Sequence, residues 1–243
     1  MSAAENLSRT NSPARRLIVA IDGPSGAGKS TIARHLAQHF GLLNLETGAM
    51  YRAFGLKALR VQCSVDDPEA LEALSSHTAI HLEPGEEHNR VILDGEDVTS
   101  LLRNQTVSDA ASRVSVFPVL RAWMVRLQQQ MGERGGVVME GRDIGTVVFP
   151  NAEVKIFLDA APEVRGLRRY EQLGGPARKP EIQPEEVIRE LRERDHRDRN
   201  RADSPLRPAP DSVLLDSTDM TLEEAVRAAE AIVEARLATT HSN

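Results

Sequence analysis

The segment GPSGAGKST, which begins at Gly23, restricts the fold of this chain more than any other part of the sequence. Its first glycine and the triplet Gly28-Lys29-Ser30 match G-x-x-x-x-G-K-[ST], a loop whose backbone N–H groups surround a phosphate. We expect Lys29 to reach the β and γ phosphates of a nucleoside triphosphate and the Ser30 hydroxyl to bind Mg²⁺. The predicted nucleotide-binding residues are Gly23, Pro24, Ser25, Gly26, Ala27, Gly28, Lys29, Ser30 and Thr31.

Short apolar runs alternate with helical patterns, which predicts an α/β fold with a central parallel sheet flanked by helices. The runs are continuous, as in strands that are covered on both faces. A strand before the loop and a helix after it favour a phosphate loop over a glycine-rich structural turn, which needs neither the lysine nor the hydroxyl. The expected strands are 17–21, 42–45, 137–139, 154–158 and 213–216, and the expected helices are 29–40, 50–60, 106–131, 185–201 and 221–238.

One segment departs from this alternation. From about 78 to 99 the sequence predicts two or three short antiparallel strands, with a turn at Asp94-Gly95. We interpret it as a small antiparallel β insert attached to the α/β core. The expected organisation is a disordered N-terminal tail over 1–15, one phosphate-loop domain over 16–238 with this insert at about 63–103 and a lid region at about 162–201, and a tail over 239–243.

Composition excludes several classes of protein. The net charge of −6 gives no general attraction to nucleic acid or anionic membranes, and no apolar run is long enough to span a bilayer. The polar N-terminus lacks the apolar stretch of a signal peptide, although a transit peptide is an alternative. Cys63 is the only cysteine, which suits a reducing cytoplasm. The seven histidines are scattered in the sequence, so we expect no zinc site.

The segment LETGAMYR, after the second strand, suits an acceptor that carries its own phosphate. Thr47 is expected to cap a helix, and Gly48 allows a ligand to approach closely. Tyr51 and Arg52 follow one turn later, and an arginine can hold a phosphate with two hydrogen bonds. The alternative is an ordinary helix start with an exposed arginine.

A second basic position follows the strand that ends in VVME. Arg142 and Asp143 lie in the glycine-flanked segment GRDIG, at the carboxyl end of a parallel strand, where open α/β sheets bind ligands. A surface Arg–Asp pair is the alternative interpretation.

The segment ELRERDHRDRNR at 190–201 has no apolar residue after Leu191. A helix here would place Arg194, Asp198 and Arg201 along one face. The run could be a solvated helix with internal ion pairs. We favour an arginine-rich lid, because five arginines among residues 192–201 exceed the three acids there.

Together these segments resemble bacterial cytidylate kinases, nucleoside monophosphate kinases that transfer the γ phosphate of ATP to CMP or dCMP. The resemblance covers residues 16 to about 235 and rests on five motifs in order. The motifs are AIDGPSGAGKST, LETGAMYR, VVMEGRDIGTVVFP, VKIFLDA and RERDHRDRNRADSPL. Glu46 stands where these kinases often have Asp, and Ser30 stands where some members have Gly.

The resemblance also implies roles for individual residues. Cytosine would be read by Ser112, Arg121 and Asp143. The acceptor phosphate would be held by Arg52, Arg142 and Arg201, with Arg194 and Asp198 near the ribose hydroxyls. Arg168 would help to hold ATP, and Thr47 and Tyr51 would complete the acceptor pocket. The residues expected to act in catalysis are Lys29, Arg142, Arg194 and Arg201.

The expected reaction is direct in-line transfer by a monomer, with ATP, Mg²⁺ and CMP or dCMP as its small-molecule partners. A kinase of another acceptor, such as UMP, shikimate or gluconate, is the alternative within this fold. A GTP-dependent switch is a third possibility, but the sequence has no N-K-x-D segment for reading guanine.

Overall fold

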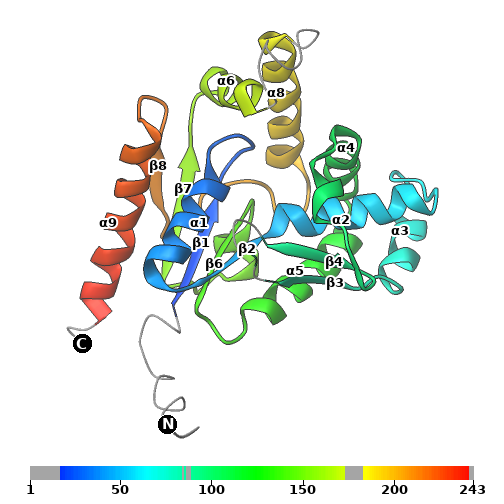
Figure 1. Ribbon diagram of the computed structural model, residues 1–243, viewed down its shortest axis with the longest axis horizontal. Helices are drawn as coiled ribbons and strands as arrows, with labels where there is room; N and C mark the ends of the chain where they lie inside the picture. The colour runs from blue at the N-terminus through cyan, green and yellow to red at the C-terminus, as the bar shows by residue number, and fades with distance from the viewer. Residues whose placement is uncertain (1–16, 84, 86–88, 173–182, 241–243) are drawn as a thin grey trace, which may run out of the picture.

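The computed structural model describes residues 17–83, 85, 89–172 and 183–240 (Figure 1). The predicted N-terminal tail, the segment 173–182 of the predicted lid region and residues 241–243 therefore lie outside the described residues.

A five-stranded parallel sheet forms the centre of the molecule, which confirms the predicted α/β fold. Its strand order is β2-β6-β1-β7-β8. All four pairings are parallel, and the first strand pairs Ile18 with Val137 on one side and Val19 with Val154 on the other. The strands are β1 (Ile18–Asp22), β2 (Leu43–Glu46), β6 (Val137–Gly141), β7 (Val154–Asp159) and β8 (Val213–Asp216).

Helices cover both faces of this sheet. On one face, α1 (Lys29–Phe40) and α9 (Leu222–Thr240) pack on alternate residues of β1, Val19 and Ile21. The other face of β1 packs with β6 against the one-turn π-helix η3 (Ile144–Val148) and side chains of α5 (Pro118–Gly132). The helix α9 ends at Thr240, two residues beyond the helix expected over 221–238.

The antiparallel insert is confirmed as a three-stranded sheet, β3 (Ile80–Glu83), β4 (Arg90–Leu93) and β5 (Glu96–Asp97). It shares a core with α2 (Thr47–Arg60), whose Phe54 is fully buried there. The short 3₁₀ helix η2 (Thr99–Arg103) follows the sheet, and the helix α3 (Pro68–Ser75), which the sequence analysis missed, precedes it. Its start carries a recognisable signal, because the Asp67 side chain accepts hydrogen bonds from two backbone N–H groups, next to Pro68 at the first helical position.

The single helix expected over 106–131 is wrong. The chain forms α4 (Gln105–Val114) and α5, separated by Ser115–Phe117. Pro118 explains the break, since a proline disfavours helical backbone in the residue before it and is well accommodated at the first helical position.

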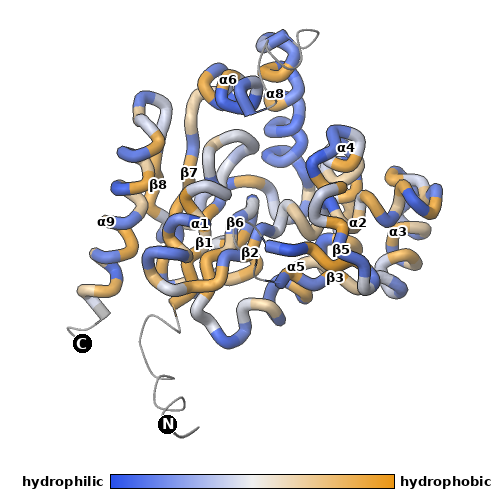
Figure 2. Tube along the Cα trace, in the orientation of Figure 1, coloured by the Kyte–Doolittle hydropathy of each residue, from blue (hydrophilic) through white to orange (hydrophobic). Residues whose placement is uncertain are grey.

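Two helices lie over the carboxyl ends of the strands, α6 (Pro162–Gln172) and α8 (Pro184–Asn200), at the top of Figure 1. The tube of α8 is mostly hydrophilic in Figure 2. Its few buried residues are Val187, Leu191, Asp195 and Asp198, so this helix buries two carboxylates beside two aliphatic side chains. The described helices include none that is both long and apolar enough to cross a bilayer.

At position 23, the conformation of the phosphate loop leaves room only for glycine. The φ of Gly23 is 152°, and a Cβ atom built on it would lie 1.9 Å from the carbonyl oxygen of Leu158 on the neighbouring strand β7. Gly41, which ends α1, also has a positive φ, of 67°, but a Cβ there would meet nothing within 4 Å.

These two glycines give a matched test of packing. Gly41→Ala adds only backbone strain and should lower the free energy of unfolding by about 1 kcal/mol. Gly23→Ala adds a backbone clash and should cost more than about 4 kcal/mol or prevent folding. Chemical denaturation of both variants measures the difference, and equal losses would contradict this account of the loop.

Candidate active site

The phosphate loop joins β1 to α1 and places its lysine inside the protein. Gly28, with a φ of 97°, precedes the helix, and Lys29 is its first residue. The buried Lys29 Nζ donates a hydrogen bond of 2.7 Å to the carbonyl oxygen of Pro24. Burial, and secondarily the charge of Arg142, lower the pKa of Lys29 to about 7. An anion beside Nζ would restore the charged form, which is what the phosphates of a nucleotide provide.

Ser30 and Glu140 form an oxygen pair that suits Mg²⁺. The Ser30 hydroxyl donates to Glu140 Oε1 over 2.9 Å, and both residues line the same cavity. Magnesium prefers hard oxygen ligands and retains some of its water, so a hydroxyl, a carboxylate and nucleotide phosphates fit its requirements. Glu140 was not among the predicted residues. Its position at the carboxyl end of β6, which pairs with β1, was the available signal.

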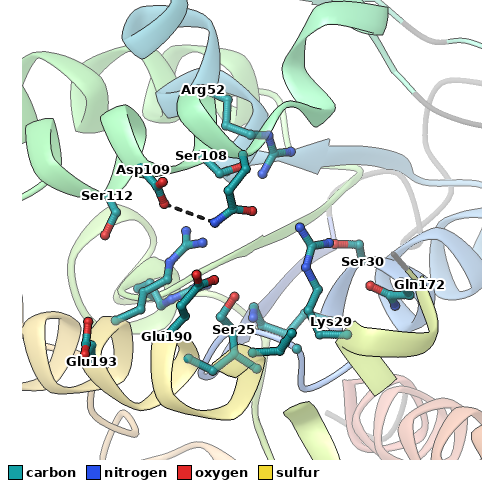
Figure 3. A pocket seen from close by; sticks show the side chains of 18 of the residues that line it. Ser25, Lys29, Ser30, Arg52, Ser108, Asp109, Ser112, Gln172, Glu190 and Glu193 are labelled. Atoms are coloured by element: carbon teal, nitrogen blue, oxygen red, sulfur yellow. Dashed lines mark hydrogen bonds between the residues drawn. The ribbon is translucent and has the colours of Figure 1, made fainter. Parts of the chain in front are cut away.

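A cavity of about 690 Å³ opens in front of the loop (Figure 3). In this view Ser25, Lys29 and Ser30 face it from the loop side, while Ser108 and Ser112 face it from α4. Its volume suits small-molecule ligands. Other predicted residues in its wall are Gly26, Gly28, Thr31, Arg52, Arg142 and Arg194.

More of the side chains in the cavity wall are positively charged than negatively charged. Burial, and secondarily the neighbouring Arg142, lower the pKa of Arg194 to about 10, and its Nε has no hydrogen-bond partner among the described residues. Burial also lowers the pKa of Arg52, although Glu140 and Glu46 oppose the shift. Cations that are buried at this density favour a polyanionic ligand, because the neighbouring carboxylates compensate only part of their charge.

Three arginines in the cavity wall were missed by the sequence analysis: Arg113 on α4, Arg169 on α6 and Arg197 on α8. Arg197 Nη2 lies 3.3 Å from the Ser112 hydroxyl, across the cavity from its own helix. Arg169 and Arg197 lie in segments that contain several other arginines, and Arg113 is an isolated arginine on α4, so nothing in the sequence was a reason to select these three.

Asp198 and Arg142 connect α8 to the end of β6. Arg142 Nε donates to Asp198 Oδ2 over 2.8 Å. Although burial opposes it, the charges of Arg142 and Arg194 hold the pKa of Asp198 below its usual value. Arg201, directly after α8, lies 3.9 Å from the other oxygen of Asp198. The predicted face of Arg194, Asp198 and Arg201 therefore points inward and is not the solvated surface of the alternative interpretation.

A buried polar cluster forms where α5, the segment after β6 and the residue after α8 meet. Arg121 on α5 forms an ion pair with Asp143, and Arg201 lies 3.8 Å from the other carboxylate oxygen. The Tyr51 ring lies 6.0 Å from the Arg121 guanidinium carbon, and burial raises the pKa of Tyr51 to about 12. Arg121 Nε and Arg201 Nη2 have no hydrogen-bond partner among the described residues, so this group retains donors for a ligand.

One expectation, the Thr47 cap on α2, differs from the observed contacts, and another, the role of Arg168, is not tested by them. Thr47 does not cap α2, because Glu46 occupies the cap position and the Thr47 hydroxyl donates 2.8 Å to the carbonyl oxygen of Glu140. Arg168 donates to the Ser217 hydroxyl and to the carbonyl oxygens of Ser217 and Met220, while its neighbour Arg169 lines the cavity. Whether Arg168 contacts ATP stays a prediction.

Two further residues hold the site together and were not predicted. Arg165 donates to the carbonyl oxygen of Ser25 in the phosphate loop over 3.0 Å and pairs with Asp195 of α8 at 2.6 Å. Asp22 accepts hydrogen bonds of 2.8 and 2.7 Å from the backbone N–H groups of Ile144 and Gly145. Burial, partly offset by these bonds, raises the pKa of Asp22 to about 7.

The sequence matches one known family over most of its length. The model of that family, described as cytidylate kinase, matches residues 19–235. The chain belongs to the cytidylate kinase family. A curated cytidylate kinase from Solibacter usitatus is 49% identical over 223 residues, which are 92% of this chain and 94% of that protein. Another, from Syntrophotalea carbinolica, is 48% identical over 210 residues, covering 86% and 88%.

Among solved structures, a gluconokinase from Sinorhizobium meliloti superposes with a TM-score of 0.47 and 17% identity, over 94% of this chain and 97% of that chain. Because this similarity is low, the substrate of that gluconokinase does not indicate the substrate of this chain.

Nucleotide binding should be coupled to proton uptake at Lys29. At pH 8, above its pKa of about 7, Lys29 is mostly neutral in the free protein. The phosphates of ATP raise this pKa, so close to one proton should be taken up per ATP bound at pH 8. Titration calorimetry in buffers of different ionisation enthalpy measures this number. Lys29→Met should remove the uptake, and the same uptake in that variant would assign the proton to another group.

Proposed function

We propose that this chain transfers the γ-phosphoryl group of ATP to CMP or dCMP, giving CDP or dCDP and ADP. The observation that carries the proposal is the placement of the Arg121–Asp143 pair, a buried donor and acceptor group directly beside Arg201 and Asp198. Such a group can bond the amine, ring nitrogen and carbonyl of cytosine, while neighbouring arginines hold the phosphate of the same nucleotide. Membership of the cytidylate kinase family supports it.

The side chains divide into a donor side and an acceptor side. On the donor side, the phosphate loop and Lys29 hold the ATP phosphates, and Ser30 with Glu140 would hold Mg²⁺. That ion, when bound, neutralises charge on the β and γ phosphates. On the acceptor side, Arg52 and Arg142 hold the CMP phosphate so that its oxygen faces the γ phosphorus in line with the leaving oxygen of ADP.

Transfer then needs no covalent intermediate on the protein. The acceptor phosphate oxygen forms the new bond to the γ phosphorus as the bond to the β–γ bridging oxygen breaks, and ADP leaves. Lys29, Arg142 and Arg194 stabilise charge on the transferring group. The helices α6 and α8 act as the lid, since Arg165 and Asp195 join them to the loop, and the lid keeps water from the γ phosphate.

We further propose a monomer in the cytoplasm. The single cysteine suits a reducing compartment. For the monomer, the support is membership of the cytidylate kinase family.

A coupled ADP-release assay with Mg·ATP tests the activity. The acceptor panel contains CMP, dCMP, UMP, AMP, GMP, shikimate and gluconate. We expect strong turnover with CMP and dCMP only, because only these present both a phosphate to the arginines and cytosine to Ser112, Arg121 and Asp143. Turnover with shikimate or gluconate alone would contradict the acceptor pocket, and ATP binding without turnover on any acceptor would favour a nucleotide switch.

The base-reading residues should affect the acceptor more than ATP. Ser112→Ala should raise the KM for CMP about tenfold, and Asp143→Asn should raise it further, because each change leaves a polar group of cytosine without a partner. The KM for ATP should stay within about twofold. Ser108→Ala is the matched control, one turn away on α4 in the same cavity wall, and should change neither value. Equal increases for CMP and ATP would remove these residues from base recognition.

A further inference from the structure

Two histidines and a glutamate meet between helices α1 and α9, which cover one face of the sheet. His35 and His39 lie one turn apart on α1, so they share a face of that helix. Glu230 reaches them from α9. Its Oε1 lies 2.6 Å from His35 Nε2 and 3.2 Å from His39 Nδ1.

The packing of the two helices fixes this meeting point. Leu36 and Ala33 of α1 share a buried core with Ala229 and Val233 of α9. The three polar side chains occupy the rim of that contact, with the histidine side chains 42% and 46% exposed and Glu230 19% exposed. The rim is therefore open to ions from solvent while its backbone is held by the core.

We propose that His35, His39 and Glu230 form a binding site for a divalent late transition metal ion, with Zn²⁺ as its best fit. The three donor atoms all lie within 4.8 Å of one another. A tetrahedral zinc site with bonds of about 2.0–2.1 Å needs ligand atoms about 3.3 Å apart, so side-chain rotations suffice to form it. Water supplies the fourth ligand.

The donor types separate this site from the magnesium site. Two imidazole nitrogens and one carboxylate are the ligands of zinc, nickel and copper, whereas magnesium prefers oxygen alone. The ordinary alternative is a hydrogen-bonded surface ion pair, in which one imidazole is enough. Here two imidazole nitrogens converge on the same carboxylate oxygen, and the two rings stack with centroids 6.1 Å apart.

The bound ion would join the C-terminal helix to the helix that begins at Lys29. His35 and His39 lie about 9 and 15 Å along α1 from that residue, towards the opposite end of the helix. The site is therefore outside the cavity in which phosphoryl transfer is proposed. It should stabilise the fold and leave turnover unchanged.

The test uses the full chain without a histidine tag, free of nucleotide and treated with chelator. Calorimetric titration with ZnCl₂ should find one site per chain. At a free zinc concentration ten times the Kd, the Tm should rise by about 3–6 °C. His35→Ala, His39→Ala and Glu230→Gln should each weaken zinc binding at least about tenfold, because each removes one ligand. Phosphoryl transfer by the zinc-free variants should match that of the zinc-free parent.

His196→Ala is the matched control, since His196 is on the remote helix α8, and it should leave the zinc affinity unchanged. The proposal is overturned if zinc does not bind, or if it binds equally well after the loss of either histidine of α1. It is also overturned if His196→Ala weakens binding as much as His35→Ala does.

Discussion

The accumulation of buried positive charge at the end of a parallel sheet is the constraint on which the rest of the site depends. Lys29 and Arg194 both have lowered pKa values, chiefly because they are removed from water. Glu140 and Asp198 offset part of that charge, but the arrangement favours a further anion. The ligand therefore contributes to the stability of its own site, and the fold must hold the cations in place until it arrives.

Several side chains outside the cavity provide that support. Asp22 ties the end of β1 to η3 through two backbone N–H groups, which positions the segment carrying Arg142. Arg165 connects the phosphate loop to α8 through Ser25 and Asp195. A change at either position would act on the site indirectly, by moving the residues that we propose to hold phosphate.

The sequence predicted the local structure best where short-range chemistry decides it. The helix at 29–40 and the strands of the parallel sheet were predicted within a few residues, because continuous apolar runs and a glycine-rich loop are strong local signals. The prediction failed where one residue overrides a pattern, as Pro118 does in dividing the helix expected over 106–131. It also missed Glu140, whose partner Ser30 is 110 residues away in the chain.

The sequence by itself determined the phosphate loop, the strands and helices of the α/β class and the arginine-rich helix α8, since each of these elements depends on residues close together in the chain. Only the tertiary structure decided which arginines enter the cavity, that Arg169 rather than Arg168 lines it, and that Arg121 pairs with Asp143. It likewise placed Glu230 beside two histidines that had been interpreted as scattered. The physical reason is that strand order and helix packing bring together side chains whose separation in sequence carries no signal of their contact.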